Sequence, residues 1–284
     1  MTNKELQNQY LNQLEKIYGA GEAAVMTTMI FESIAKLSKQ DLLLKANLQV
    51  ENKTEIILTN ALNRLLKHEP IQYIIGKAWF YNLSFIVNKA VLIPRPETEE
   101  LVLEAINFLK QHKSKNVLDI GTGSGCIPIS IKKNIAEVSV TSVDISDDAL
   151  NLAKENATAN EVEITFLNFN FLEEKNYSTL PKFDVIISNP PYIPENEKNI
   201  MAKNVTMFEP HIALFVPQND PLIFYKKILL FAKEHLEEDG KIFLEIHEDF
   251  ATETAAIFTE KNYEVTIKKD MQGKERILVV SRCP

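Results

Sequence analysis

The spacing of apolar residues divides the chain into a helical first part and a second part in which strands and helices alternate. In residues 1–75 apolar side chains recur every three or four positions, which predicts four helices. Thr2 and Glu5 have the spacing of a capping box before the first helix, and Ser38 is the expected cap of the third. One face of the first helix is expected to carry Leu6, Tyr10, Leu14 and Ile17.

The period changes after residue 75, where aromatic and β-branched residues become frequent. The run AWFYNLSFIV has Asn82 near its centre and predicts a short β-hairpin. The next stretch, VLIPRPETEELV, holds two prolines and then opens a helix near Glu97. We therefore expect a helical domain over residues 1–75, a hairpin linker over 76–93 and a second domain over 94–284.

The second domain alternates strand-like and helix-like segments, which indicates an α/β fold with a Rossmann-like, doubly wound sheet. Five of its seven expected strands, NVLDI, SVTSVDI, EITFLN, FDVIIS and KIFLEI, fit a mostly parallel arrangement. The last two, YEVTIKK and RILVVSR, indicate a closing hairpin that makes one edge strand antiparallel. A long helix is expected to run through residues 221–240 and to close on Gly240.

Composition and charge narrow the possible functions. The 284 residues are 45% hydrophobic and 25% charged, which is ample for a buried core. The net charge of −8 lies outside residues 1–75, where acidic and basic residues balance, so there is no basic arm and direct nucleic-acid binding is not expected. Cys126 and Cys283 form no ligand cluster, so neither a metal site nor a disulfide framework is expected. The polar start and the lack of a membrane-length apolar run predict a cytoplasmic protein without a membrane partner.

A glycine-rich turn, VLDIGTGSGC, follows the first strand of the second domain and precedes a helix. Gly121, Gly123 and Gly125 allow a tight turn and the close approach of a ligand. Cys126 occupies the place of the last glycine in a dinucleotide-binding fingerprint, so a ligand without pyrophosphate fits better. Asp144 ends the next strand, where a carboxylate can accept hydrogen bonds from ribose hydroxyls. A plain strand-to-helix turn and a helix-entry acid are the alternatives, but their combination in one β-α-β unit favours a nucleoside site.

The stretch SNPPY comes directly after the apolar run FDVIIS and ends that strand, because proline has no N–H to give to the ladder. Taken alone, it fits an ordinary strand-to-loop turn. Together with the glycine turn and Asp144, however, it resembles the S-adenosylmethionine site and the catalytic motif of class I methyltransferases that act on amide or amino nitrogens. With PIQYIIG, VLIPRPETEELV and FEPHIAL, the chain from about Pro70 onward resembles the HemK-type peptide chain release factor glutamine methyltransferases.

This resemblance implies a fold, a cofactor and a substrate. The fold is a seven-stranded class I methyltransferase domain with a small helical N-terminal domain. Because the methyltransferase fold is expected to be complete without these helices, we expect them to recognise the protein substrate. The cofactor is S-adenosyl-L-methionine, and the methyl acceptor is N5 of the glutamine in the Gly-Gly-Gln motif of bacterial class 1 release factors. Two other hypotheses stay open. The acidic charge argues against an adenine-N6 methyltransferase of nucleic acids, and the intact NPPY argues against a cofactor-binding module without catalysis.

The resemblance also assigns site residues position by position. The catalytic motif falls on Asn189, Pro190, Pro191 and Tyr192. The cofactor site falls on Gly121, Thr122, Gly123, Ser124, Gly125, Asp144, Asn170, Phe171 and Asn189. The chain departs from the family pattern at Asn170, where an aspartate is usual, and at His211, where an arginine is usual.

The chemistry of amide methylation gives the SNPPY motif a purpose. An amide nitrogen is a poor nucleophile, so the side-chain oxygen of Asn189 and the carbonyl of Pro190 are expected to accept its two N–H groups and aim it at the methyl group. Pro191 stiffens the loop, and Tyr192 can pack flat on the planar amide. No general base is needed, because an N-protonated amide is a strong acid, and we expect no histidine near the motif. His211, His235 and His247 are interpreted as surface or loop residues.

Overall fold

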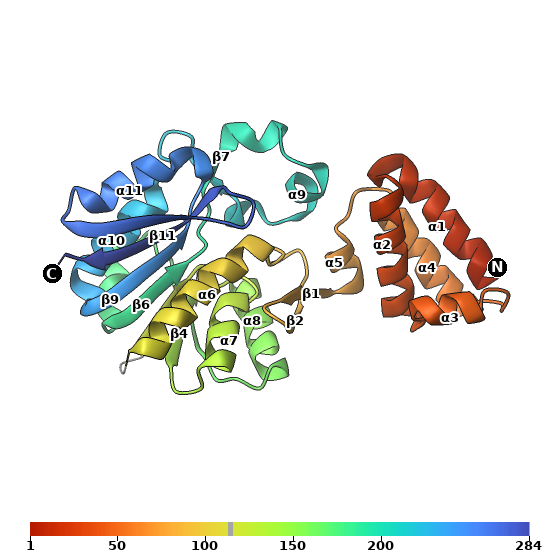
Figure 1. The fold of residues 1–284 in the computed structure, drawn as a ribbon, viewed down its shortest axis with the longest axis horizontal. Helices are drawn as coiled ribbons and strands as arrows, with labels where there is room; N and C mark the ends of the chain where they lie inside the picture. Colours follow the sequence, from red (N-terminus) through yellow and green to blue (C-terminus); the bar gives the residue numbers. More distant parts are fainter. Residues whose placement is uncertain (113–115, 284) are drawn as a thin grey trace. The chain divides into compact units, whose positions relative to one another are not determined.

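The computed structural model describes residues 1–112 and 116–283 and divides the chain into two compact units (Figure 1). The first unit contains residues 1–77 together with 202–208, and the second contains residues 78–201 and the chain from 209 onward. The short segment 202–208 therefore groups with helices that precede it by more than a hundred positions in the sequence, a feature that no local pattern indicates.

The first unit is helical throughout. Its elements are α1 (Asn3–Tyr18), α2 (Ala20–Ile30), the π-helical turn η1 (Phe31–Ala35), α3 (Lys39–Leu44), α4 (Asn52–Leu65), α5 (Ile71–Ile75) and α9 (Lys203–Phe208). The capping box at Thr2 is confirmed, and Ser38 caps α3 in the same way. Leu6, Tyr10 and Leu14 are fully buried, but Ile17 is 40% exposed, so the predicted apolar face of α1 ends one turn early.

The second unit contains a seven-stranded sheet in the order β10-β11-β9-β6-β3-β4-β5. The strands are β3 (Asn116–Ile120), β4 (Ser139–Asp144), β5 (Thr165–Asn168), β6 (Phe183–Ser188), β9 (Leu236–Glu245), β10 (Tyr263–Lys269) and β11 (Glu275–Arg282). All neighbours pair in parallel except at β11, which is antiparallel to both β9 and β10. The predicted closing hairpin is confirmed, and β10 at the edge of the sheet pairs antiparallel with β11. The second strand of the closing hairpin pairs with β9, so the antiparallel strand is internal and β10 forms the edge.

Helices cover both faces of this sheet, as the doubly wound prediction requires (Figure 1). They are α6 (Pro96–Gln111), α7 (Cys126–Asn134), α8 (Asp147–Ala159), α10 (Ile223–His235) and α11 (Ala251–Thr259). Along β6, Val185 packs in the core cluster with α6 and α7, whereas Ile186 packs in the cluster with α10 and α11. This alternation follows from the two-residue period of a strand and explains why the parallel strands are apolar on both faces.

Two small pairs of strands flank the sheet. The predicted hairpin is confirmed as β1 (Lys77–Phe80) and β2 (Leu83–Ile86), and its turn residues Tyr81 and Asn82 have φ of 50° and 61°. Positive φ at both central positions is the signature of a type I′ turn, which suits the twist of a hairpin. After the SNPPY stretch, β7 (Ile193–Pro194) pairs in parallel with β8 (Phe215–Val216).

The long helix predicted to close on Gly240 is shorter than expected. It ends at His235, and β9 begins at Leu236. Pairing with β6 is irregular here, because Phe183 faces Leu236 whereas Val185 faces Lys241. A Cβ atom on Gly240 would lie 2.8 Å from the Leu236 side chain, so the glycine fills a crowded bulge in the strand and does not cap a helix.

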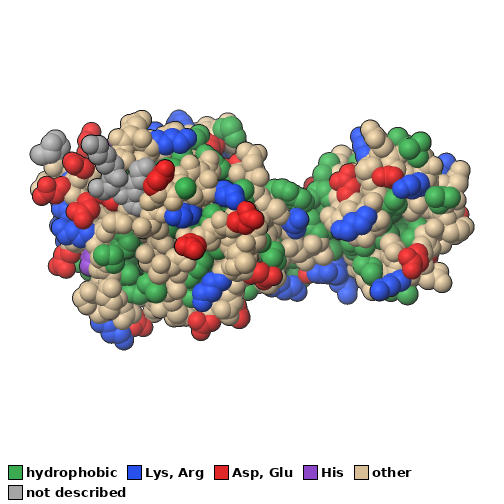
Figure 2. Space-filling model, turned by 90° about the horizontal axis from the view of Figure 1, so that it is seen from below, with side chains coloured by type: hydrophobic (Ala, Val, Ile, Leu, Met, Phe, Trp, Pro, Cys, Tyr) green, Lys and Arg blue, Asp and Glu red, His purple; other side chains and the backbone are tan. Residues whose placement is uncertain are grey.

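The surface carries both acidic and basic side chains (Figure 2). In the view of Figure 2, acidic and basic side chains are interspersed over the visible face of each unit. That face therefore presents no concentrated basic track for a phosphate backbone. Among the described residues, none of the helices combines the length and the apolarity that crossing a membrane requires.

We expect Gly125→Ala to destabilise the protein more than Gly273→Ala. Both glycines have positive φ, 80° and 84°, so alanine strains both backbones by about 1–2 kcal/mol. At Gly125 a Cβ would also lie 3.0 Å from Ile129 and 3.2 Å from Ala153, whereas at Gly273 it meets no atom within 4 Å. Overpacking should add about 1–3 kcal/mol at Gly125 alone, measured by urea unfolding. Equal losses for the two variants would mean that α7 does not depend on this contact.

Candidate active site

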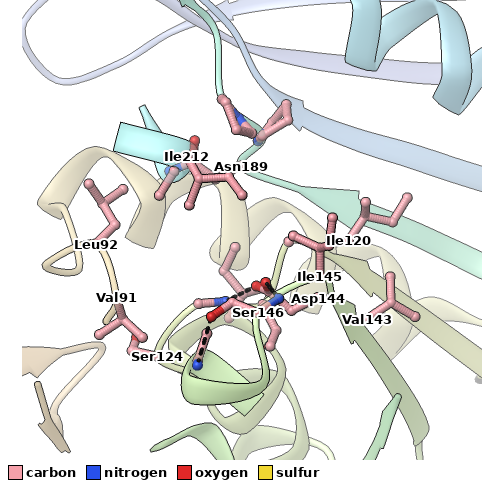
Figure 3. Close-up of a pocket in the computed structure, with 18 of the residues that line it drawn as sticks. Val91, Leu92, Ile120, Ser124, Val143, Asp144, Ile145, Ser146, Asn189 and Ile212 are labelled. Atoms are coloured by element: carbon pink, nitrogen blue, oxygen red, sulfur yellow. Dashed lines mark hydrogen bonds between the residues drawn. The ribbon is translucent and has the colours of Figure 1, made fainter. Parts of the chain in front are cut away.

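A pocket opens at the carboxyl ends of the central parallel strands (Figure 3). Strands β3, β4 and β6 end at Ile120, Asp144 and Ser188, and parallel pairing brings these ends to one edge of the sheet. The Ser188 hydroxyl donates to the Ile120 carbonyl at 2.7 Å and ties the end of β6 to the end of β3. Ligands of open α/β sheets bind at this edge, so the position alone marks a candidate site.

The glycine turn forms one wall of the pocket. Gly121 and Gly123 line it with φ of 76° and 53°, and a Cβ on either would meet no protein atom within 4 Å. The turn is held from behind, because the N–H groups of Gly121 and Thr122 donate to the Val143 carbonyl at 2.9 and 3.1 Å. Gly125 does not line the pocket and instead packs α7 against α8, so its contact with a cofactor stays a prediction.

Asp144 lies on the adjoining wall and connects the glycine turn with the start of α8 (Figure 3). Its Oδ2 accepts the N–H of Gly123 and its Oδ1 accepts the N–H of Ser146, both at 2.9 Å. Ser146 itself caps α8 by accepting the N–H of Ala149, so the helix does not need Asp144 as its cap. Each carboxylate oxygen keeps a second lone pair, and these are available to hydroxyl groups in the pocket.

Asn170 and Phe171 also line the pocket, but both already have partners within the protein. The Asn170 amide oxygen accepts the N–H of Leu172 at 3.1 Å, and its nitrogen donates to Glu173 at 3.0 Å. The Phe171 ring is buried, with the rings of Tyr177 and Phe231 centred 5.2 and 5.4 Å away. Their predicted contacts with adenine therefore stay predictions, with one lone pair remaining on the Asn170 oxygen.

Asn189, Pro190 and Pro191 line the pocket after the end of β6, the strand next to β3, whereas Tyr192 does not line it. The Asn189 nitrogen Nδ2 donates to Thr98 Oγ1 at 3.1 Å, and no described residue donates to its oxygen. The Tyr192 hydroxyl donates to Glu245 Oε1 at 3.1 Å, and its ring packs against the core beneath α10. The predicted stacking of Tyr192 on a substrate amide accordingly stays a prediction.

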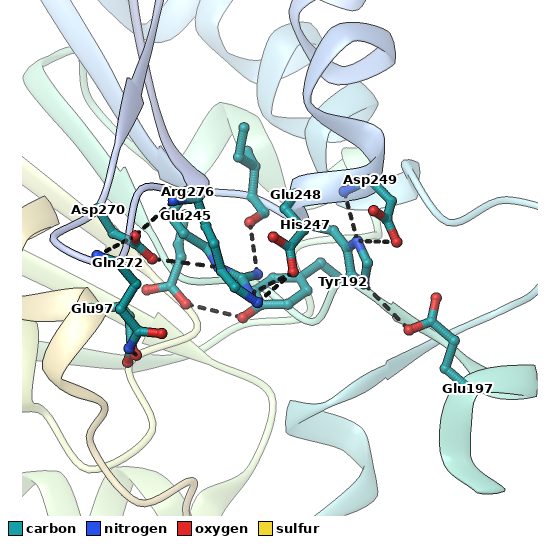
Figure 4. A network of polar contacts seen from close by, with 12 residues as sticks. Glu97, Tyr192, Glu197, Glu245, His247, Glu248, Asp249, Asp270, Gln272 and Arg276 are labelled. Atoms are coloured by element: carbon teal, nitrogen blue, oxygen red, sulfur yellow. Dashed lines mark hydrogen bonds and ion pairs between the residues drawn. The ribbon is translucent and has the colours of Figure 1, made fainter. Parts of the chain in front are cut away.

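Two buried residues near the SNPPY stretch were not singled out in the sequence, and a third residue, His247, was interpreted only as a surface or loop residue. Thr98 in the first turn of α6 and Glu245 at the end of β9 are buried and bond to each other at 2.6 Å. His247 lies with its ring centre 5.9 Å from that of Tyr192 and forms an ion-pair contact of 3.4 Å with Glu197 (Figure 4). The expectation that no histidine lies near the motif is therefore wrong, because β9 ends beside β6 and returns His247 to it.

An ion pair joins two stretches that are far apart in the sequence. Arg95, from VLIPRPETEELV, contacts Glu209 of FEPHIAL at 2.6 Å, and Glu209 also accepts the N–H of Ile93. Both stretches contribute to the pocket, through Arg95 and through Ile212 and Ala213. His211 directly precedes Ile212 in the chain, and its ring lies roughly perpendicular to that of Phe215, with the ring centres 5.3 Å apart.

The single cysteine near the glycine turn is not a nucleophile. Cys126 is buried at the start of α7, and burial raises the pKa of its thiol to about 12. A thiol that stays protonated in a packed environment reacts poorly. Cys126 is therefore a packed thiol at the start of α7.

The second unit has the fold of the class I methyltransferases, enzymes that take their methyl group from S-adenosylmethionine. A methyltransferase from Pyrococcus furiosus aligns with a TM-score of 0.52 and 21% identity over 78% of this chain and 97% of that one. Residues 100–211 match the family model of the methyltransferase small domain. Residues 5–76 match that of the PrmC N-terminal domain.

Sequence relatives specify the family. A release factor glutamine methyltransferase from Flavobacterium psychrophilum is 41% identical, with 99% of each chain covered. One from Bacteroides thetaiotaomicron is 37% identical, covering 96% of this chain and 98% of the relative. The chain belongs to the family of release factor glutamine methyltransferases, as the resemblance noted in its motifs had indicated.

A further buried acid, Asp119, lies directly before the glycine turn. It is fully buried, and neither carboxylate oxygen has a hydrogen-bond partner among the described residues. Burial raises the pKa of Asp119 to about 7, because the charged form loses its hydration. The hydroxyls of Thr122 and Ser142 oppose this shift only in part.

We expect Asp119→Asn to stabilise the protein at pH 8 much more than at pH 5. An aspartate carboxyl ordinarily has a pKa of 3.8, and burial raises that of Asp119 to about 7, so the folded state binds more protons between these values. Its contribution to stability therefore falls as the pH rises, by about 1.4 kcal/mol for each unit across that window. Urea unfolding of both proteins from pH 4 to 8, without cofactor, measures the difference. A difference in unfolding free energy that is independent of pH would show that Asp119 does not titrate in this range.

Proposed function

We propose that this protein transfers the methyl group of S-adenosylmethionine to N5 of a glutamine side chain in bacterial class 1 release factors, at their Gly-Gly-Gln motif. The observation that carries the proposal is the amide of Asn189, whose nitrogen is engaged by Thr98 while its oxygen is left to the pocket. The names of the relatives, release factor glutamine methyltransferases, support the substrate.

The pocket fits the cofactor in three respects. Gly121 and Gly123 leave open space where a side chain would otherwise obstruct a ligand. Asp144 keeps free lone pairs at the pocket wall, which suits ribose hydroxyls. The remaining wall is largely apolar, with Ile145 and Leu172 among its residues, which suits a purine ring. We assign cofactor binding to Gly121, Thr122, Gly123, Ser124, Gly125, Asp144, Asn170, Phe171 and Asn189.

Orientation is the main task of the protein in this reaction. When bound, the cofactor supplies an electrophilic methyl group on a sulfonium centre. The glutamine nitrogen has its lone pair delocalised into the carbonyl, so it must be held with that lone pair aimed at the methyl group. The Asn189 oxygen and the Pro190 carbonyl accept its two N–H groups. The same two acceptors stabilise the positive charge that grows on nitrogen during transfer.

The reaction needs no general base from the protein. Once methylated, the protonated amide nitrogen is strongly acidic and releases its proton to water. His247 does not line the pocket, although it touches Tyr192, which is consistent with a structural role for that ring. We assign catalysis to Asn189, Pro190, Pro191 and Tyr192. Tyr192 does not line the pocket in this structure, and packing of its ring on the substrate amide is proposed for the complex with substrate.

The helical N-terminal part is proposed to recognise the release factor. The pocket, the sheet and the SNPPY stretch all belong to the second unit, so the methyltransferase fold is complete without the helices of the first. We retain the proposed division into residues 1–75 for recognition, 76–93 as a hairpin linker and 94–284 for methyl transfer. The reaction is proposed to take place in the cytoplasm, where release factors act, without direct contact to nucleic acid or membrane.

We expect label from S-adenosylmethionine to appear on a purified release factor and not on duplex DNA. Mass spectrometry should locate the added methyl group on the side-chain nitrogen of the Gly-Gly-Gln glutamine. Labelling of DNA alone would identify an adenine methyltransferase instead. If the protein binds the cofactor but labels neither substrate, it would be a cofactor-binding module without methyltransferase activity on them.

We expect Asn189→Ala to lower turnover on the order of 100- to 1,000-fold, the usual effect of removing one preorganised polar contact to the reacting group. Affinity for the cofactor, measured by calorimetry, should change much less. Asn168→Ala is the matched control, because Asn168 is exposed at the end of β5 and bonds only to Ile145 and Asp147. Normal single-turnover rates for Asn189→Ala at saturating substrate would rule out the amide clamp.

A further inference from the structure

The buried carboxylate of Glu245 connects to both ends of the NPPY stretch, to Asn189 through Thr98 and to Tyr192 directly. Glu245 Oε1 accepts the hydroxyl of Tyr192 at 3.1 Å (Figure 4). Its Oε2 accepts the hydroxyl of Thr98 at 2.6 Å. Thr98 in turn accepts the Nδ2 of Asn189 at 3.1 Å. Glu245 and Thr98 are each only 2% exposed, so water does not compete for these bonds.

The direction of these bonds decides which way the Asn189 amide faces. A carboxylate can only accept, and Thr98 has one hydroxyl hydrogen, which goes to Glu245. The Thr98 oxygen can therefore only accept from its other neighbour, so Asn189 must present its NH2 group to Thr98 and its oxygen elsewhere. If the Asn189 amide were rotated by 180°, its oxygen would face the Thr98 oxygen, whose only hydrogen is already donated to Glu245.

Tyr192 receives the same kind of support. Burial raises the pKa of Tyr192, so its hydroxyl keeps its proton and acts as a donor to Glu245. Burial also raises the pKa of Glu245, while the bonds from Thr98 and Tyr192 and the charge of Arg276 oppose that shift. The backbone carbonyl of Glu245 accepts the hydroxyl of Tyr225 at 3.0 Å, which fixes the end of β9.

Stability alone does not explain why a carboxylate is buried at this place, because ionising a buried acid costs free energy. Replacing buried charged groups by apolar ones of similar volume is often neutral or stabilising in proteins. Glu245 closes a strand that is otherwise apolar at Phe243 and Leu244, so a buried acid at this position is unusual. The hydrogen bonds of Glu245 lead through Thr98 to Asn189, which lines the pocket, and to Tyr192 in the adjoining loop. These connections point to a role in the reaction.

We propose that Glu245, acting through Thr98, is the positioning residue that holds the oxygen of Asn189 toward the substrate amide and, through Tyr192, anchors the other end of the NPPY stretch. The proposal rests on the proposed function for what the amide does, but not for how the amide is oriented. Neither Glu245 nor Thr98 takes or gives a proton to the substrate in this scheme.

The test compares Thr98→Val, which removes the hydroxyl at nearly constant volume, with Thr98→Ser, which keeps it. Thr98→Val should lower turnover roughly 5- to 100-fold, the effect of leaving one polar group unpaired, with cofactor affinity unchanged, and Thr98→Ser should recover most of it. Thr254→Val is the control, because Thr254 is a buried threonine whose hydroxyl has no partner among the described residues. Glu245→Gln should also lower turnover, since a glutamine can donate to Thr98 and reverse the bonds.

A double-mutant cycle separates positioning from a general structural effect. If Thr98 acts through Asn189, Thr98→Val should cause no further loss of turnover in the Asn189→Ala background. An equal loss in both backgrounds would overturn the proposal, as would wild-type turnover in both Thr98→Val and Glu245→Gln.

A measurement without substrate distinguishes failure of this proposal from failure of the proposed function. In ¹⁵N-labelled protein, the side-chain amide signals of Asn189 are identified by their loss in Asn189→Ala. In Thr98→Val they should shift and exchange their hydrogens faster, whereas Thr254→Val should leave them unchanged. Unchanged signals in Thr98→Val would overturn the proposal even in an active enzyme. A wild-type protein that fails to methylate release factor, but shows the shift, would refute the proposed function alone.

Discussion

The parallel pairing of β6 with β3 is the constraint on which the site depends, because it places Asn189 beside the glycine turn. Ile120 and Ser188 are the last pair of that ladder, and the Ser188 hydroxyl holds the two strand ends together. A slip of one residue would turn the Asn189 side chain to the other face of the sheet. A slip of two would move it by about 6–7 Å along the strand, out of reach of Thr98.

Most of the fold could be predicted because its signals are local. The caps at Thr2 and Ser38, the turn at Asn82 and the glycine turn each depend on residues within a few positions of one another. The errors come from pairing over longer distances. Nothing near Gly240 indicates that a helical pattern gives way to a strand at Leu236, because the bulge that the glycine fills exists only opposite β6.

The site residues also separate into those that local motifs indicate and those that only long-range contacts bring together. Asp144 and Asn189 end strands within recognisable stretches, so sequence reasoning could assign them to one edge of the sheet. Thr98 looked like an ordinary residue in the first turn of a helix, and its partner Glu245 lies 147 positions away. A usable signal was present all the same. Glu245 closes an apolar strand just as Asp119 interrupts one, and an acid within a buried strand needs a reason.

Glu245 and Asp119 are buried at the same edge of the sheet but differ in the hydrogen bonds and charges around them. Burial raises the pKa of Glu245, but two hydroxyl donors and the nearby Arg276 oppose that rise from within the chain. Asp119 forms no hydrogen bond through its carboxylate among the described residues, so burial dominates and raises its pKa to about 7. A positive charge brought close to Asp119 would lower that pKa again. Since a shift of pKa is also a free energy of interaction, a positive charge beside the glycine turn would restore stability that ionisation of Asp119 removes as the pH rises toward 7. A positive charge at the end of β3 would therefore be stabilised by Asp119, whereas Glu245 at the end of β9 already has the charge of Arg276 nearby.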